Sequence, residues 1–280
     1  MTSNTKILVT GAHGFVGARA MERYRNAVPV PAGLTRNPGD ALSDFVKRHH
    51  PDVILNAAAI SDIGVCEKNP DASYTANVTL PVVLARAAEA TGAKLLSFSS
   101  DQVYTGCLHD GPYAEDIPLP EPANVYARHK LEAEARTLDL SPSAVLLRAT
   151  WMYDMPMADH ANRGNFWVNT LRSLLYGTPL VHSSGEYRGI TYVRQVAALL
   201  DNAADLPGGV YNYGSENHLS MHDTAKAMLD ALGVTADVQD PAAKKHDLRI
   251  DCAKLRKYEI VFDTTEEGFR RCARDYGMGR

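Results

Sequence analysis

An α/β fold, with a doubly wound parallel sheet and a smaller, interwoven C-terminal lobe, is what this 280-residue sequence predicts. Three observations lead to it. Short apolar runs alternate with helical segments as far as about residue 150, as in chains that place helices on both faces of a parallel sheet. The first run ends in a glycine-rich turn, and the alternation loosens beyond Trp151. We therefore expect a first domain over residues 1–150, to which 190–213 return, and a second lobe from 151–189 and 214–280.

The elements of the first domain follow from the apolar runs and the residues that stop them. Lys6 to Thr10 is a short apolar run that ends at a glycine, which is typical of a buried parallel strand. The long Ala-rich helix is stopped by Gly92. The expected strands are 6–10, 28–34, 53–56, 94–99 and 144–148, and the expected helices are 18–25, 41–49, 72–91 and 124–138.

Helix-start signals organise the second half of the chain. Ser220-x-x-Asp223 resembles a capping box that opens a helix ending at Gly233, and Thr264-x-x-Glu267 is a stronger box for a C-terminal helix. Two further helices are expected over 165–176 and 191–203, and a strand over 209–213. We interpret residues 151–189 and 214–280 as the lobe that binds the substrate.

Composition excludes several classes of protein. Hydrophobic residues make up 45% and charged residues 22%, the formal net charge is -4, and the basic residues are interspersed, which argues against nucleic-acid binding. No apolar run approaches the roughly 20 residues that span a bilayer, and Met1 to Lys6 is polar, so we expect a cytoplasmic protein without a membrane segment. The four cysteines form no CxxC, and no metal site is predicted.

A glycine-rich turn joins the first strand to the first helix. Gly11, Gly14 and Gly17 stand where a dinucleotide-binding, Rossmann-type fingerprint requires them. Unpaired N–H groups and the helix dipole can hold a pyrophosphate at such a helix start. The spacing is G-x-x-G-x-x-G instead of the commoner G-x-G-x-x-G, so an ordinary strand-to-helix turn is the alternative interpretation.

The choice of cofactor is usually made near the end of the second strand. An acidic residue there binds the ribose 2′-hydroxyl of NAD, but this region contains Arg36 and no acid before Asp40. Arg36 could bind a 2′-phosphate, which favours NADP(H) slightly over NAD(H), although an ordinary surface arginine is the alternative. The small residues after Asn56, which are Ala57, Ala58 and Ala59, leave room for a cofactor at the sheet edge.

Tyr126 and Lys130 stand four residues apart in a predicted helix, so they share one face. A nearby cation favours phenolate, which predicts a lowered pKa for Tyr126. Tyr126 is therefore a candidate general acid or base. The spacing alone is common, and its meaning depends on the rest of the chain.

Several motifs in order resemble an extended short-chain dehydrogenase/reductase. They are TGAHGFVG, the NAAA at residues 56–59, the SSDQVY at 99–104 and the YARHK at 126–130. Within that superfamily the chain is most similar to the dTDP-4-dehydrorhamnose reductase (RmlD-like substrate-binding) family, through PDVILNAAA, CEKNPDASYTANV, PYAED, NVYARHKLEAE and LLRATWMY. The likeness covers the chain to about residue 200.

The resemblance implies a Ser-Tyr-Lys triad of Ser100, Tyr126 and Lys130 that reduces the C4 ketone of a nucleotide-linked 6-deoxy sugar with NAD(P)H. Tyr126 would donate the proton, Ser100 would orient the ketone oxygen, and Lys130 would bind the nicotinamide ribose. Ser99 is the alternative to Ser100 as the serine that faces the sugar.

The candidate site residues fall into three groups. The catalytic candidates are Ser100, Tyr126 and Lys130. The cofactor-binding candidates are Gly11, His13, Gly14, Phe15, Val16, Gly17, Arg36, Asn56, Ala57, Ala58, Ala59, Ser99, Tyr126, Lys130 and Ala149. The substrate-binding candidates are Asp101, Val103, Trp151, Asn165 and Arg188, although each of the last three could equally serve packing or the surface.

Other functions stay open beside a sugar-nucleotide reductase. Similar 4,6-dehydratases carry Asp-Glu after the hydroxyl residue, whereas Gln102 here cannot transfer a proton. A sugar-nucleotide epimerase, a reductase of another carbonyl compound, and a non-catalytic NAD(P)-binding regulatory subunit of another enzyme are the alternatives. Relatives often pair through the helices near 72–91 and 124–138, which is compatible with a homodimer.

Overall fold

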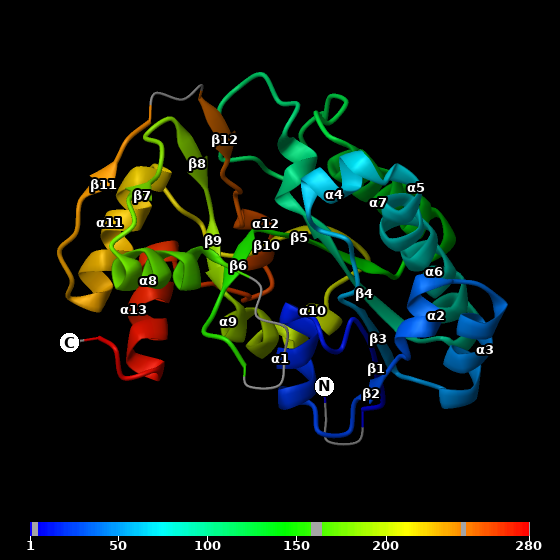
Figure 1. The fold of residues 1–280 in the computed structure, drawn as a ribbon. Helices are drawn as coiled ribbons and strands as arrows, with labels where there is room; N and C mark the ends of the chain where they lie inside the picture. The colour runs from blue at the N-terminus through cyan, green and yellow to red at the C-terminus, as the bar shows by residue number, and fades with distance from the viewer. Residues whose placement is uncertain (2–4, 158–163, 242–244, 280) are drawn as a thin grey trace. The chain divides into compact units, whose positions relative to one another are not determined.

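The computed structural model describes residues 1, 5–157, 164–241 and 245–279. The chain forms two compact units, each built from several segments (Figure 1). Unit 1 comprises Met1–Cys107, Pro118–Ala149 and Ala197–Tyr211, and unit 2 comprises Leu108–Ile117, Thr150–Val196 and Asn212–Arg280.

These boundaries differ from the expected ones mainly in two places, apart from shifts of one or two residues at Thr150 and at 212–213. Residues 190–196, expected to return to the first domain, belong to unit 2 because strand β9 (Ile190–Tyr192) pairs with β6 (Trp151–Tyr153). Residues 108–117 also belong to unit 2, where the Tyr113 N–H donates to the Arg249 carbonyl at 2.8 Å. Both differences come from strand pairings between distant parts of the sequence.

A six-stranded sheet with the order β10-β5-β4-β3-β1-β2 forms the centre of the first half of the fold. β1 pairs in parallel with β2 and β3, and β4 pairs in parallel with β3 and β5. Strands covered on both faces are expected to be apolar throughout, and β1, β3 and β5 are buried at every position. The predicted α/β class is confirmed. The strands are β1 Ile7–Thr10, β2 Val28–Pro29, β3 Val53–Asn56, β4 Lys94–Ser100, β5 Val145–Ala149 and β10 Gly209–Tyr213.

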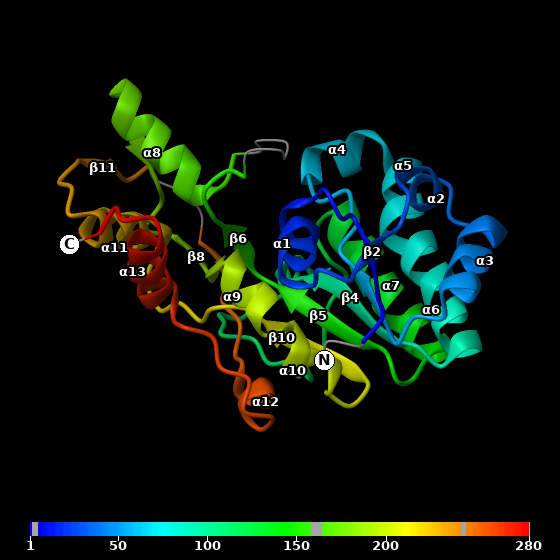
Figure 2. The same cartoon turned by 90° about the horizontal axis from the view of Figure 1, so that it is seen from below.

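Helices cover both faces of this sheet (Figure 2). α1 packs on β1, and its end is tied to α10 because Arg23 and Tyr24 both bind Asp201. α6 and α7 pack against each other and on β4, and α3 packs on α6. The helices of unit 1 are α1 Phe15–Arg23, α2 Ala32–Arg36, α3 Asp40–His49, α4 Ile63–Lys68, α5 Pro70–Tyr74, α6 Leu80–Thr91, α7 Val125–Leu140 and α10 Leu200–Ala204, with a π-helical turn at Thr75–Thr79 (η1) and a 3-10 turn at Asp101–Tyr104 (η2).

Three expected elements differ in the structure. The strand predicted over 28–34 is wrong: β2 ends at Pro29 and α2 begins after Pro31, because proline has no N–H for a strand ladder and suits a helix start. The helix predicted over 72–91 is interrupted by η1. The helix predicted over 191–203 instead consists of β9, α9 (Val193–Ala198) and α10.

The described residues of unit 2 form three parallel strand pairs and three long helices around an aromatic core. Tyr153 lies at the centre of this core, with its ring centroid 5.6 Å from that of Trp167 and 5.0 Å from that of Phe269. The remaining elements are α8 Phe166–Tyr176, β7 Leu180–Val181, β8 Glu186–Arg188, α11 Met221–Leu232, β11 Val238–Gln239, β12 His246–Leu248, α12 Ala253–Arg256 and α13 Thr265–Asp275.

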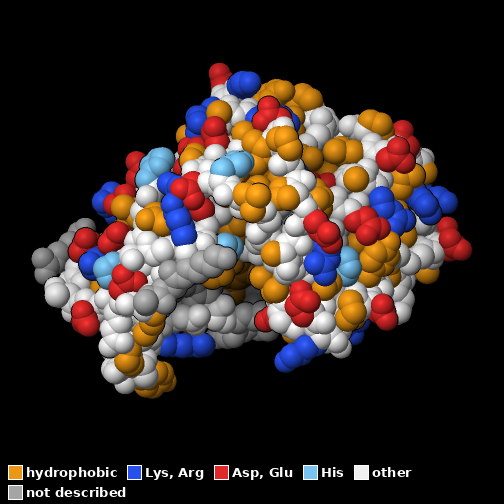
Figure 3. Space-filling view, turned by 90° about the horizontal axis from the view of Figure 1, so that it is seen from above, with side chains coloured by type: hydrophobic (Ala, Val, Ile, Leu, Met, Phe, Trp, Pro, Cys, Tyr) orange, Lys and Arg blue, Asp and Glu red, His pale blue; other side chains and the backbone are white. Residues whose placement is uncertain are grey.

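Charged side chains of both signs are mixed on the surface that Figure 3 shows, where Lys and Arg are interspersed with Asp and Glu. None of the helices in the described part of the chain combines the length and the apolar content that crossing a bilayer would require.

The capping box at the start of α13 is confirmed. The Thr264 hydroxyl accepts from the Glu267 N–H, and the Glu267 carboxylate accepts from the Thr264 N–H at 2.8 Å. At α11 the Ser220 hydroxyl accepts from the Asp223 N–H at 3.1 Å and also donates to the Asp223 carboxylate.

Replacing Thr264 with Ala should lower the free energy of unfolding by about 1 kcal/mol, because an N–H of the first helical turn loses its acceptor. Denaturant unfolding would measure the change. The exposed Thr235, in the loop after α11, is the matched control, and its replacement with Ala should have no comparable effect. Equal stability of the two variants would contradict the capping role.

Candidate active site

The turn between β1 and α1 is one that only small residues can form. Gly11 has φ +64°, and a Cβ there would lie 2.7 Å from the Ala57 carbonyl oxygen. A Cβ on Gly17 would lie 2.1 Å from the Gly11 carbonyl oxygen. The close approach of the backbone to itself and to the end of β3 therefore requires both glycines.

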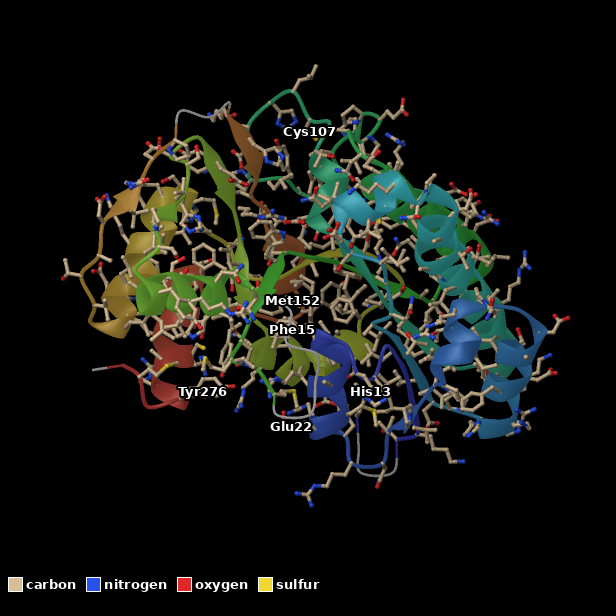
Figure 4. The ribbon with its side chains drawn as sticks, in the orientation of Figure 1. His13, Phe15, Glu22, Cys107, Met152 and Tyr276 are labelled. Atoms are coloured by element: carbon tan, nitrogen blue, oxygen red, sulfur yellow. The ribbon has the colours of Figure 1, made fainter. Side chains whose placement is uncertain are left out.

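The start of α1 suits an anion. The helix begins at Phe15 with Gly14 as its N-cap, and no side chain caps it. Its first N–H groups, together with the helix dipole, are therefore available to a pyrophosphate. His13 and Phe15, both exposed, lie at this end of the helix (Figure 4). The residues present fit a dinucleotide.

Asn56 ties together the strand ends beside this turn. Its carbonyl accepts from the Thr10 hydroxyl at 2.7 Å, and its amide donates to the Ser97 hydroxyl at 2.9 Å. The Thr10 hydroxyl also accepts from the Ala58 N–H at 3.3 Å. The buried Asn56 side chain thus links β1, β3 and β4, whereas Ala57, Ala58 and Ala59 line the edge beyond it.

The three triad candidates come together in unit 1. Ser100 ends β4, while Tyr126 and Lys130 lie on α7, whose first turn is capped by Asn124 accepting from the Ala127 N–H at 2.8 Å. The Ser100 hydroxyl accepts from the Gln102 N–H at 3.2 Å and donates to the Asp101 carboxylate at 3.2 Å. It also lies close enough to the Tyr126 phenol to lower the pKa of that phenol. The Lys130 ammonium lies 5.7 Å from the Tyr126 ring centroid.

Burial controls the protonation of the triad. It raises the pKa of Tyr126 well above its ordinary value, and the nearby Ser100 hydroxyl opposes that rise only in part. The lowered pKa expected from the Tyr126–Lys130 spacing is therefore wrong for this structure. The reason is that removal of water from the phenol dominates its pKa, while the Lys130 Nζ donates to the Phe98 carbonyl at 2.8 Å. Burial also lowers the pKa of Lys130 to about 8.

The other predicted residues of unit 1 have varied settings. Asp101 and Val103 are buried in η2, directly after Ser100. Ala149 ends β5 opposite Ser100. Ser99 donates to the Glu134 carboxylate at 2.6 Å, whereas Ser100 is the serine that acts on the pKa of Tyr126. Arg36 is exposed at the end of the short helix α2.

Three predicted substrate contacts lie in unit 2. Trp151 is 47% exposed, and the Arg188 guanidinium lies 3.7 Å from the centroid of the Trp151 ring. Asn165 caps α8 by accepting from the Val168 N–H at 3.1 Å, and its amide donates to the Asp154 carbonyl at 2.9 Å. The Asn165 side chain therefore has structural partners on both its polar atoms.

Two buried charged residues beside the triad escaped the sequence analysis. Glu134 and Arg148 form an ion pair with 2.7 Å between Oε2 and a guanidinium nitrogen. The signals were present: Glu134 stands four residues after Lys130, on the same helix face, and Arg148 interrupts an apolar strand.

The chain belongs to the family described as the RmlD substrate binding domain, since the model of that family matches residues 5–271. It is similar to the dTDP-4-dehydrorhamnose reductase of Mycobacterium tuberculosis, with 30% identity over 81% of this chain and 76% of the relative. It is also similar to the methionine adenosyltransferase 2 subunit beta of Pongo abelii, with 26% identity over 92% of this chain and 83% of the relative.

Among solved structures, the dTDP-4-dehydrorhamnose reductase of Bacillus anthracis in complex with NADP has a similar fold. The TM-score is 0.84 at 20% identity, covering 97% of this chain and 98% of that one. The likeness at this identity supports the doubly wound fold.

Replacing Gly17 with Ala should weaken NADPH binding by about tenfold or more, because the added methyl group pushes the start of α1 off the turn, a kind of overpacking that typically costs about 1–3 kcal/mol. Fluorescence titration with NADPH measures this. Gly33 is the matched control, since a Cβ there meets nothing within 4 Å. Unchanged affinity in a folded Gly17→Ala protein would rule out this turn as the cofactor site.

Proposed function

We propose that this protein is an NAD(P)H-dependent reductase of a nucleotide-diphospho-6-deoxy-4-ketosugar. The observation that carries the proposal is the meeting of Ser100, Tyr126 and Lys130 in unit 1, which also contains the glycine-rich turn of β1 and α1. The names of the similar reductases support the substrate class and the reaction.

The turn that begins at Gly11 and the N–H groups that start α1 would hold the pyrophosphate of the cofactor. When bound, the nicotinamide supplies a hydride. Ser100 would orient the ketone oxygen through its hydroxyl, and Tyr126 would donate its phenolic proton to that oxygen as the alcohol forms. Lys130 would bind the nicotinamide ribose.

The protonation state of Tyr126 favours reduction of the ketone over oxidation of the alcohol. Burial raises the pKa of Tyr126, so the phenol carries the proton that a reduction consumes. Gln102, next to Asp101, has an amide that cannot act as the acid or base of a dehydration. Its carbonyl instead accepts from the Asn124 side chain at 3.3 Å.

Finer assignments are part of the same proposal. We assign NADP(H) a slight preference over NAD(H), because Arg36 is an exposed cation close in sequence to the end of β2 and could bind a 2′-phosphate. Asp101, Val103, Trp151, Asn165 and Arg188 remain the proposed substrate contacts. A cytoplasmic location and a homodimer remain predictions.

A second function has one observation in its favour, the likeness to a methionine adenosyltransferase 2 subunit beta. In that case the chain would be an NAD(P)-binding regulatory subunit of another enzyme. Purification of a stoichiometric heterologous partner, with no ketosugar reduction by either protein alone, would support it over the reductase.

In an absorbance assay of NADPH oxidation across a panel of nucleotide 4-ketosugars, we expect turnover with at least one sugar. Replacing Tyr126 with Phe should lower kcat by about 10² or more, the usual scale of acid catalysis, and leave NADPH binding within about twofold. Replacing the exposed Tyr176 with Phe is the control and should change neither. Full turnover by the Tyr126→Phe protein would refute the mechanism.

NADPH affinity should fall as the pH rises through about 8, because Lys130 then loses the proton that lets it act as an ammonium. Below this pH the ammonium persists and binding should be constant. Lys130→Met should bind NADPH weakly, with no such pH dependence. Fluorescence titrations between about pH 7 and about pH 9.5 measure both proteins, a range that brackets this lysine. A flat profile for the unaltered protein would contradict the assigned role of Lys130.

A further inference from the structure

The ion pair between Glu134 of α7 and Arg148 of β5 is buried and makes several hydrogen bonds. Glu134 is 4% exposed and Arg148 is 3% exposed. The guanidinium donates to Oε2 at 2.7 Å and, from Nε, to Oε1 at 3.0 Å. Two hydrogen bonds of this kind fix the direction of both side chains.

Two more elements join the pair. From β4, the Ser99 hydroxyl donates to Glu134 Oε1 at 2.6 Å. From η2, the Tyr104 hydroxyl accepts from Arg148 at 2.9 Å, and the guanidinium lies 5.2 Å from the centroid of the Tyr104 ring. The pair therefore connects α7, β4, β5 and the turn that follows β4.

These are the elements that carry the triad candidates. Ser99 directly precedes Ser100, and Glu134 lies one helical turn after Lys130 and two after Tyr126, on the same face of α7. Lys130, Glu134 and Ser99 also line one small cavity of about 10 Å³. A shift of Glu134 would thus move Lys130 and Tyr126 relative to Ser100.

The carboxylate also acts on the charge of Lys130. Burial lowers the pKa of Lys130, and the negative charge of Glu134 is the largest influence that opposes this. The other titratable groups near the lysine are Tyr126 on its own helix and Cys66 from α4, while Arg148 from β5 faces Glu134. Asp101 acts on Tyr126 from η2.

Stability alone does not account for such a pair. Desolvation of two charges often cancels their attraction, and apolar residues of similar size in their place are often neutral or stabilising. The contacts with Ser99 and with the helix turn of Lys130 indicate a further role.

We propose that Glu134 is a positioning residue for the reduction: anchored by Arg148 and Ser99, it holds the Tyr126 and Lys130 turns of α7 against the end of β4. This inference rests on the proposed function of Tyr126 and Lys130. It adds to that function a residue that touches neither substrate nor cofactor.

Glu134→Gln tests the proposal, because it keeps the shape and removes the charge. The pH at which NADPH affinity falls should move down by about one unit, which appears as a loss of roughly tenfold at a pH near 8.5 and of less than about threefold near pH 6. Turnover of the ketosugar should follow the same shift. Glu132→Gln, which removes an exposed carboxylate on the same helix that pairs with Arg136 at 3.0 Å, should shift neither profile.

Two further variants keep the test decisive. Glu134→Asp retains the charge and should keep the pH profile of the unaltered protein, but its kcat should fall because the shorter side chain misplaces the helix turn. If Glu134→Gln does not fold, the double variant Glu134→Met, Arg148→Met, which removes both buried charges together, should fold and still shift the profile.

A folded Glu134→Gln or double variant with an unchanged pH profile and full turnover would overturn the inference. If the unaltered protein binds NADPH but reduces no ketosugar, the proposed function fails, and the shift in the binding profile still decides the role of Glu134.

Discussion

The packing of α7 across the end of β4 is the interaction on which the site depends. It brings a phenol and an ammonium, spaced by one helical turn, beside the hydroxyl of Ser100. The N-cap at Asn124 fixes where the helix starts, and Lys130 donates to a carbonyl of β4. A local helical spacing thus becomes a chemical site only through a nonlocal contact.

The same packing sets the protonation states. Removing water from the triad favours the neutral forms of both Tyr126 and Lys130. A neutral phenol suits a proton donor, whereas a neutral amine would not suit a residue that binds through its charge. The charge of the buried Glu134 carboxylate opposes the fall in the pKa of Lys130. The environment of the triad therefore favours a neutral Tyr126 while helping Lys130 to keep its charge.

Much of the fold could be predicted from local patterns. The first strand, the glycine-rich turn and the boundaries of β3 and β10 follow from apolar runs and from glycine, and the fold class and family are confirmed. The strand over 28–34 failed because Pro29 and Pro31 end the ladder, a signal that the apolar pattern masked. The prediction of a lowered pKa for Tyr126 was wrong, because the spacing of residues in a helix carries no information about their desolvation.

The hydrogen-bond and ion-pair partners of individual side chains could not be predicted from the sequence. Asn56 and Asn165 have the polar groups of ligand contacts, yet their bonds run to Ser97 and Asp154, on segments that sequence spacing does not connect. The Glu134–Arg148 pair spans a helix and a strand in the same way. Such partners follow from the sheet order, and roles in binding for the predicted site residues remain predictions.

The most direct test of the central claim is transfer of deuterium from labelled NADPH to a nucleotide-diphospho-6-deoxy-4-ketosugar, followed by NMR of the product. A ketosugar reductase should give one deuterium at C4 of the sugar for each NADPH oxidised, because the transferred deuteride forms the new C–D bond there. The claim is contradicted if the folded protein binds NADPH yet leaves every such sugar unlabelled.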